Sequence, residues 1–160
     1  MRELTKLTVF ASGAMFVLAG IMTGLSATLV PMATEFGIAP TRAGVFYSIH
    51  FSGFMALVIG SVALRGLRAR LITTVVTAAV YSLSLAVSGL TSAFPVMVAA
   101  LFIVGGCGGV LEAQTATVQV MTARNEQQAG RVIAITQATF AVGALFAPIY
   151  AFGGPAFALE

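Results

Sequence analysis

One carboxyl group, one imidazole and a small set of hydroxyl and amide groups could do chemistry within the apolar stretches of this 160-residue sequence. Glu112 follows a glycine-rich run that begins at Gly105, and His50 is the single histidine. A carboxyl group away from bulk water takes up and releases a proton according to the side that admits water, and an imidazole can relay one near neutral pH. Glu112 and His50 are therefore the candidates for proton coupling.

Both groups also have a structural interpretation. Glu112 could stay protonated and hydrogen-bond a neighbouring helix through Gln137, and His50 could bond Tyr47 or water near a membrane surface. Ionisable side chains inside a membrane are by default candidates for functional sites. We therefore favour proton coupling for Glu112 and leave both interpretations of His50 open.

Small and polar residues recur at helical spacing in two segments. One stripe comprises Gly105, Gly108, Gly109, Glu112, Thr115, Ala116 and Gln119, and the other comprises Gly20, Thr23, Gly24, Ala27, Thr28 and Pro31. The glycines alone fit tight helix packing, whereas the polar members suggest that both segments face a common central space. The predicted contacts to a small polar solute are Thr23, Thr28, Thr115, Gln119 and Gln137. Gln114 projects away from Glu112 and is expected to bond another helix.

The composition determines which elements carry these residues. The sequence is 59% hydrophobic and 8% charged, with a mean hydropathy of +1.02, whereas soluble domains are roughly 25% charged. A bilayer core takes a helix of about 20 residues, and five stretches qualify: 7–32, 43–64, 71–90, 95–121 and 132–152. We predict an all-α bundle of five transmembrane helices, forming a single transmembrane domain over residues 1–160. Thr41 is expected to cap the second helix at its N-terminus.

The basic residues indicate topology rather than nucleic-acid binding, although the net charge is +3. Seven of the eight fall before the first stretch or in the links after the second and fourth, and only Arg42 falls on the other side. The positive-inside rule then predicts a cytoplasmic N-terminus in a plasma (bacterial inner) membrane. The segment that begins at Gly153 is expected on the outer side.

A faint internal repeat relates the helices. An offset of 89 positions places Gly20 on Gly109 and Thr28 on Thr117, and an offset of 86 places Phe54 on Phe140. The related first and fourth helices run in opposite directions, as in the inverted repeats of many secondary transporters. We predict an inverted three-helix repeat that lacks its sixth helix.

Other functional classes lack the residues they need. Cys107 is the single cysteine and His50 has no cysteine or carboxylate at ligand spacing, so neither a disulfide nor a metal site is expected. The glycine-rich run lies inside a span and is not followed by the lysine of a phosphate loop. We predict a protein that is not an enzyme and that uses no cofactor, with a bilayer and a small solute rather than nucleic acid as partners.

The link between the second and third helices carries a family resemblance. It reads Gly60-Ser-Val-Ala-Leu-Arg-Gly-Leu-Arg-Ala-Arg70 and is similar to the Gly-x-x-x-Asp-Arg-x-Gly-Arg-Arg signature of the major facilitator superfamily. With the repeat and the glycine-rich fourth helix, the chain resembles the N-terminal half of such a transporter. Leu64 replaces the Asp of the signature, Leu67 its second Gly and Ala69 an Arg, so the latch role that the family gives this loop does not carry over directly.

Within that superfamily, the glycine-rich run ending in Leu111-Glu112 looks most like the fucose-permease-like sugar:proton symporters. The resemblance implies that Glu112 takes part in proton coupling. The acidic partner expected in the first helix is absent from residues 7–32, and Ala116 stands where an Asn often follows. Sugar recognition is therefore implied less directly than the fold.

Five helices are fewer than the 12 that the resemblance implies around a central path. The chain is expected to be part of a larger transporter, or a short protein whose bundle is completed by another copy of itself or by a second polypeptide. The alternative function is a non-transporting structural or assembly subunit of a larger membrane complex.

Overall fold

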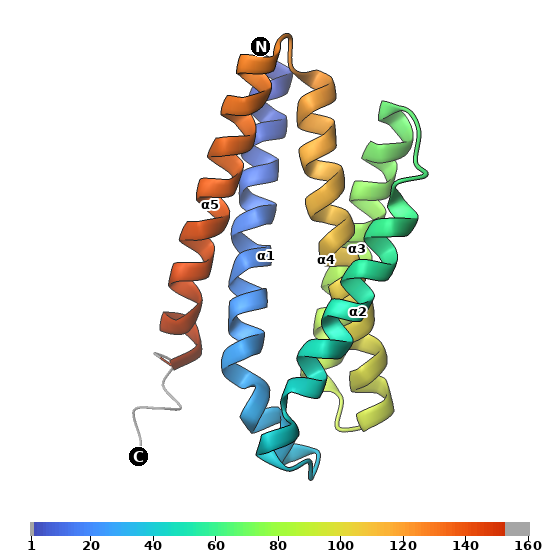
Figure 1. Cartoon of the computed structure of the whole chain (residues 1–160), viewed down its shortest axis with the longest axis vertical. Coiled ribbons are helices and arrows are strands. Elements are labelled where there is room, and N and C mark those ends of the chain that lie inside the picture. Colours follow the sequence, from blue (N-terminus) through green and yellow to red (C-terminus); the bar gives the residue numbers. More distant parts are fainter. Residues whose placement is uncertain (1, 153–160) are drawn as a thin grey trace. The chain divides into compact units, whose positions relative to one another are not determined.

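The computed structural model describes residues 2–152, with side chains described for residues 4–146. Five α-helices follow one another (Figure 1): α1 (Arg2–Glu35), α2 (Gly44–Ser61), α3 (Leu67–Leu90), α4 (Phe94–Thr122) and α5 (Glu126–Phe152). Each is long and apolar enough to cross a membrane. The predicted all-α fold with five transmembrane helices is confirmed. The segment from Gly153, which we expect on the outer side, lies outside the described residues.

The helix ends depart from the apolar stretches for local reasons. α1 and α5 begin several residues early, at Arg2 and Glu126, because polar residues continue a helix beyond its apolar part. The expected cap at Thr41 is wrong: Pro40–Arg42 forms a 3₁₀ helix, and α2 starts after Ala43 without a side-chain cap. Pro40 has the φ that a first helical turn needs, which favours the short helix.

Two units of contacts make up the chain, and each is described by itself. Unit 1 comprises residues 1–28 and 119–160, and unit 2 comprises residues 29–118. Unit 2 therefore holds α2, α3 and most of α4, whereas unit 1 holds α5, most of α1 and the end of α4.

In unit 2, α2 and α4 cross backbone to backbone at two glycines, which we call the unit 2 crossing. A Cβ atom at Gly53 would overlap the Phe102 carbonyl, and one at Gly105 would overlap the His50 carbonyl. Each glycine thus faces the carbonyl three residues before the other, an arrangement suited to Cα–H···O contacts. Only glycines allow helices to approach this closely.

Beyond that crossing, three aromatic rings join the neighbouring ends of α1, α2 and α4 within unit 2. The ring centroids of Phe36, Phe46 and Phe94 lie 5.8–6.2 Å apart, and Phe94 meets both other rings edge to face. Edge-to-face aromatic pairs add about 0.5–1.5 kcal/mol beyond area burial. The rings therefore hold these helix ends together where no glycine does.

In unit 1, α1 and α5 lie side by side and run in the same direction (Figure 1), and they meet at the unit 1 crossing. A Cβ atom at Gly143 would overlap the Phe16 carbonyl, whereas one at Gly20 would lie 4.0 Å from the Gly143 carbonyl. The predicted offsets place Gly20 on Gly109 and Leu57 on Gly143, and these residues also meet the facing helix in unit 2. The two crossings thus join helix pairs that the predicted repeat relates, α4 with α2 and α1 with α5, and the repeat itself stays a prediction.

Candidate functional site

Glu112 lies on the most buried helix. In the most apolar stretch of α4 61% of the residues are buried, against 17–22% in the other four helices. Glu112 itself is half-buried, and no hydrogen bond or ion pair joins it to any residue that the structure describes. At about 100° per residue it lies roughly 20° around α4 from Gly105, on the side that meets α2. An unpaired carboxyl group within a span is costly against lipid.

On the opposite side of α4, Gln114 binds the guanidinium group of Arg70. The Arg70 guanidinium donates from Nη1 to Gln114 Oε1 (2.7 Å) and from Nη2 to the Leu64 carbonyl (2.7 Å). The Gln114 amide in turn donates to the Ser61 carbonyl at 3.4 Å. Gln114 is therefore bonded to another helix, as its predicted direction required. Because Gln114 lies about 160° around α4 from Glu112, Arg70 does not neutralise that carboxyl group.

His50 sits in the α2 face that meets α4. It is 1% exposed, its ring meets Phe51 edge to face at 5.9 Å, and its Nδ1 has no hydrogen-bond partner among the described residues. Its carbonyl lies against Gly105, about 10 Å along α4 from Glu112 at 1.5 Å per residue. The two candidate proton carriers therefore do not pair directly.

Thr115 differs from several other threonines that the structure describes. Thr28, Thr74 and Thr117 donate their hydroxyl groups to main-chain carbonyls of their own helices. The Thr115 hydroxyl is buried with no partner among the residues that the structure describes. It is one helical turn from Glu112. The Thr115 hydroxyl is thus enclosed without a partner among the described residues, whereas the exposed Thr28 hydroxyl already has a partner.

Gln119 and Thr136 form a polar tie inside unit 1. The Thr136 hydroxyl donates to the Val132 carbonyl (2.9 Å), so its oxygen accepts from Gln119 Nε2 (2.8 Å). This chain fixes the amide orientation and leaves Gln119 Oε1 as a buried acceptor without a partner among the described residues. Gln119, which is 1% exposed, therefore presents an acceptor, not a donor.

The remaining predicted solute contacts are less constrained. Thr23 is half-buried and Gln137 is exposed. Thr23, Gln119 and Gln137 belong to unit 1, whereas Glu112, His50 and Thr115 belong to unit 2. Within unit 1 the partner of Gln119 is Thr136, the neighbour of Gln137 that sequence reasoning missed. Thr136 could have been found as a small polar residue on the helical spacing that joins Val132 to Gly143.

No group of three or more His, Cys, Asp or Glu side chains that could hold a metal ion gathers in the described part of the chain. The polar groups of α4 include the carboxyl group of Glu112 and two groups without a partner among the described residues, the Thr115 hydroxyl and the Gln119 side-chain oxygen. Such groups can bind a proton and hydrogen-bond a solute.

The family model of the Major Facilitator Superfamily matches residues 2–148. The chain belongs to the major facilitator superfamily. Comparison with curated proteins and with solved structures gave no match. Members of the major facilitator superfamily are secondary transporters built on inverted repeats, so the chain has the sequence of a transporter family and not of an enzyme family.

The signature loop of this superfamily member departs from the family pattern, and other acceptors bond its Arg70 guanidinium. Leu64 stands where the signature has Asp, and its main-chain carbonyl accepts from Arg70. Gln114 supplies the second acceptor. A carbonyl and an amide thus hold the guanidinium here, and no carboxylate of the described residues takes part.

Proposed function

We propose that this superfamily member moves a small polar solute together with a proton, and that Glu112 carries the proton. The support is the unpaired, half-buried carboxyl group on the most buried helix. Protonation makes such a group neutral and lowers the cost of enclosing it away from water. The transporter would then change between its inward-open and outward-open states only when Glu112 is protonated, because only the neutral carboxyl group is readily enclosed away from water.

The proposed solute donates hydrogen bonds. Gln119 offers only its oxygen, since its amide nitrogen is held by Thr136, and a deprotonated Glu112 is also purely an acceptor. Polyols, sugars and amines supply donors to such groups. The fucose-permease-like resemblance of Leu111-Glu112 favours a sugar within this class. Thr23, Thr28, Thr115 and Gln137 complete the proposed contacts, and His50 is the proposed relay.

The test compares proton-driven uptake with exchange in vesicles that contain the complete transporter. A panel of radiolabelled hexoses, including fucose, serves as the probe. For Glu112→Gln we expect accumulation driven by a pH gradient to fall at least tenfold, while exchange of solute at equal pH on both sides persists. Glu112→Asp, which keeps a carboxyl group, should retain part of the accumulation. Normal accumulation in Glu112→Gln would refute the role of Glu112.

Orientation and assembly belong to the same proposal. We place the N-terminus in the cytoplasm of a bacterial inner membrane and expect the bundle to be completed by a second copy or another polypeptide. The orientation can be checked with Arg65→Cys and Thr41→Cys, each as the single cysteine of a Cys107→Ser protein. The measurement is the side of the membrane from which each thiol is labelled. Copurification in fixed ratio with a large complex, without solute flux, would instead favour the structural subunit.

A further inference from the structure

Glu112 has four neighbours on its own side of α4 within one helical turn. Residues three and four apart on a helix are neighbours, and for Glu112 these are Gly108, Gly109, Thr115 and Ala116. The two glycines and the alanine carry no polar side-chain atom. The Thr115 hydroxyl is therefore the polar group that α4 itself offers to the Glu112 carboxyl group within a turn.

The Thr115 hydroxyl group is not bonded to its own helix. Thr117 donates to the Ala113 carbonyl, four residues earlier, at 2.7 Å. The Thr115 side chain is 5% exposed, and its hydroxyl group has no partner among the described residues. Side chains on a helix lean toward its N-terminus, so Thr115 leans over the turn that holds Glu112. Since an enclosed hydroxyl group without a partner is costly, a bond to Glu112 would be favoured.

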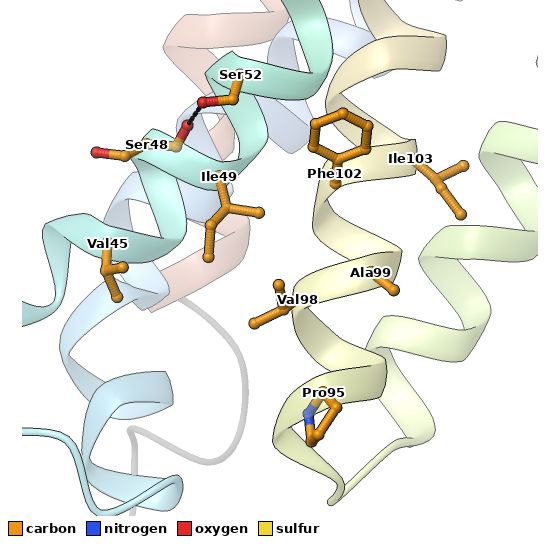
Figure 2. A pocket seen from close by; sticks show the side chains of 9 residues that line it. All are labelled: Val45, Ser48, Ile49, Ser52, Pro95, Val98, Ala99, Phe102 and Ile103. Atoms are coloured by element: carbon orange, nitrogen blue, oxygen red, sulfur yellow. Dashed lines mark hydrogen bonds between the residues drawn. The ribbon is translucent and has the colours of Figure 1, made fainter.

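The serines of α2, the helix that meets this side of α4, are bonded elsewhere. All three donate to carbonyls of their own helix: Ser48 to Gly44 at 3.2 Å, Ser52 to Ser48 at 2.7 Å (Figure 2) and Ser61 to Val58 at 2.8 Å. The α2 side chains that lie against Gly109, those of Phe54 and Val58, are apolar. α2 therefore supplies no serine hydroxyl group to Glu112.

We propose that the Thr115 hydroxyl group donates a hydrogen bond to the Glu112 carboxyl group and so positions it for uptake of the proton. The inference rests on the proposed proton coupling and deepens it. The two groups are not bonded in the structure, and rotation of the Glu112 side chain brings them together. A hydroxyl group donates one bond and accepts two, so Thr115 can hold Glu112 and still accept a bond from the solute.

Infrared difference spectra between low and high pH measure this bond on the full chain in vesicles. The carbonyl band of a protonated carboxyl group shifts to lower wavenumber when it accepts a hydrogen bond, and the band lost in Glu112→Gln belongs to Glu112. Thr115→Val keeps the side-chain shape without the hydroxyl group, so the band should move to higher wavenumber. Thr115→Ser should restore its position. Thr117→Val is the matched control and should leave the band unmoved, because that hydroxyl group is bonded to its own helix.

A second variant moves the hydroxyl group to the other neighbour. Ala116→Ser in the Thr115→Val protein places a hydroxyl group four residues from Glu112, and the band should return toward its wild-type position. In the hexose accumulation assay of the complete transporter, Thr115→Val should lower accumulation roughly fivefold, as expected for the loss of one hydrogen bond. Thr115→Ser should accumulate hexose as the wild type does.

The outcomes separate this inference from the proposed function. A Glu112 band that stays in place in Thr115→Val would overturn the bond without touching the proton coupling by Glu112. A shifted band with normal accumulation in Thr115→Val would overturn the positioning role. If Glu112→Gln removes no band, Glu112 does not change its protonation, and both proposals would fall.

Discussion

At both crossings two helix backbones approach closely at glycines, but the two crossings differ in how much room a larger side chain would have. In unit 2 two glycines each meet the other helix's backbone, so the contact is reciprocal, and Gly109 further accommodates Phe54 and Val58. Among the glycines that the structure describes in unit 1, only Gly143 would bring a Cβ atom into overlap with backbone, because a Cβ atom at Gly20 would keep an ordinary contact distance of 4.0 Å. Because α2 and α4 touch at two backbone contacts, a movement that separates the helices at one contact also breaks the other. Unit 2 is therefore expected to be the less tolerant of substitution.

The side-chain hydrogen bonds between helices also differ, and the stronger one lies in unit 2. Unit 2 has a charge-assisted bond from Arg70 to Gln114, and unit 1 has a neutral bond from Gln119 to Thr136. Bonds to charged groups contribute about 1.5–3 kcal/mol, against about 0.5–1.5 kcal/mol for neutral ones. Cys107, the lone and buried thiol, lies in unit 2. Its rate of maleimide labelling distinguishes opening of unit 2 from opening of unit 1.

The largest expected effect is that of Gly105→Ala. The added Cβ would overlap a main-chain carbonyl that cannot rotate away, so the helices must separate, at a cost of about 3 kcal/mol. Titration with SDS in mixed micelles, followed by circular dichroism, measures the loss, and Cys107 should label faster. Gly89→Ala, where a Cβ meets nothing within 4 Å, is the control and should stabilise α3 by about 0.5–1 kcal/mol. Equal stability of the two variants would remove the basis of the comparison.

Next in size is Arg70→Met. It leaves Gln114 Oε1 and the Leu64 carbonyl without their donor, and a buried acceptor left unsatisfied costs about 1–3 kcal/mol. Arg68→Met, at an exposed position of the same link, should change the free energy of unfolding by less than about 0.5 kcal/mol. The double variant Arg70→Met, Gln114→Met should lose less than the sum of the single variants. Strict additivity would show that the two side chains are not coupled.

A smaller effect is expected for Gly143→Ala in unit 1. One backbone contact must give, so we expect a loss of about 1–2 kcal/mol with unchanged labelling of Cys107. Gly20→Ala, with 4.0 Å to the nearest atom, should be close to neutral. If Gly143→Ala accelerates labelling as much as Gly105→Ala does, the two units do not open separately.

Much of this molecule could be predicted from its sequence, because lipid imposes few solutions on a chain. Hydropathy predicts the five spans. Helical angle predicts the close approach at the α4 glycines and the hydrogen bond of Gln114 to another helix. The hydrogen-bond partners on neighbouring helices could not be predicted. Helical spacing fixes the side of the helix on which a residue lies, but not which residue of the next helix it meets. The bond from Gln119 to Thr136 was missed for this reason, although spacing alone places Thr136 on the α5 face of Val132 and Gly143.

The same limit applies to the candidate site. Helical angle correctly directed Gln114 to a neighbouring helix, and it grouped Thr115 with Gln119 on one side of α4. It could not show that Thr115 lacks the main-chain bond that other threonines make, because that choice depends on the hydroxyl rotamer. Nor could it orient the Gln119 amide, which depends on Thr136 and Val132.

The smallest expected effect, that of Thr136→Val, sharpens the comparison most. The change removes an acceptor from Gln119 Nε2 while keeping the shape of the side chain, and a neutral bond of this kind contributes about 1 kcal/mol. Thr139→Val is the matched control, because Thr139 also donates to a carbonyl of its own helix but holds no amide. The difference in SDS unfolding between the two variants isolates the Gln119 bond.

Gln119→Leu decides whether that bond or the hydroxyl itself carries the effect of Thr136→Val. Replacing both partners of a buried hydrogen bond by apolar groups of similar shape leaves nothing unsatisfied, so it costs less than removing one. Thr136→Val combined with Gln119→Leu should therefore recover part of the stability lost by Thr136→Val alone, with Cys107 labelling unchanged throughout. A double variant less stable than either single variant would mean that the two side chains stabilise unit 1 through separate contacts, and the fixed acceptor at Gln119 would lose its structural cause.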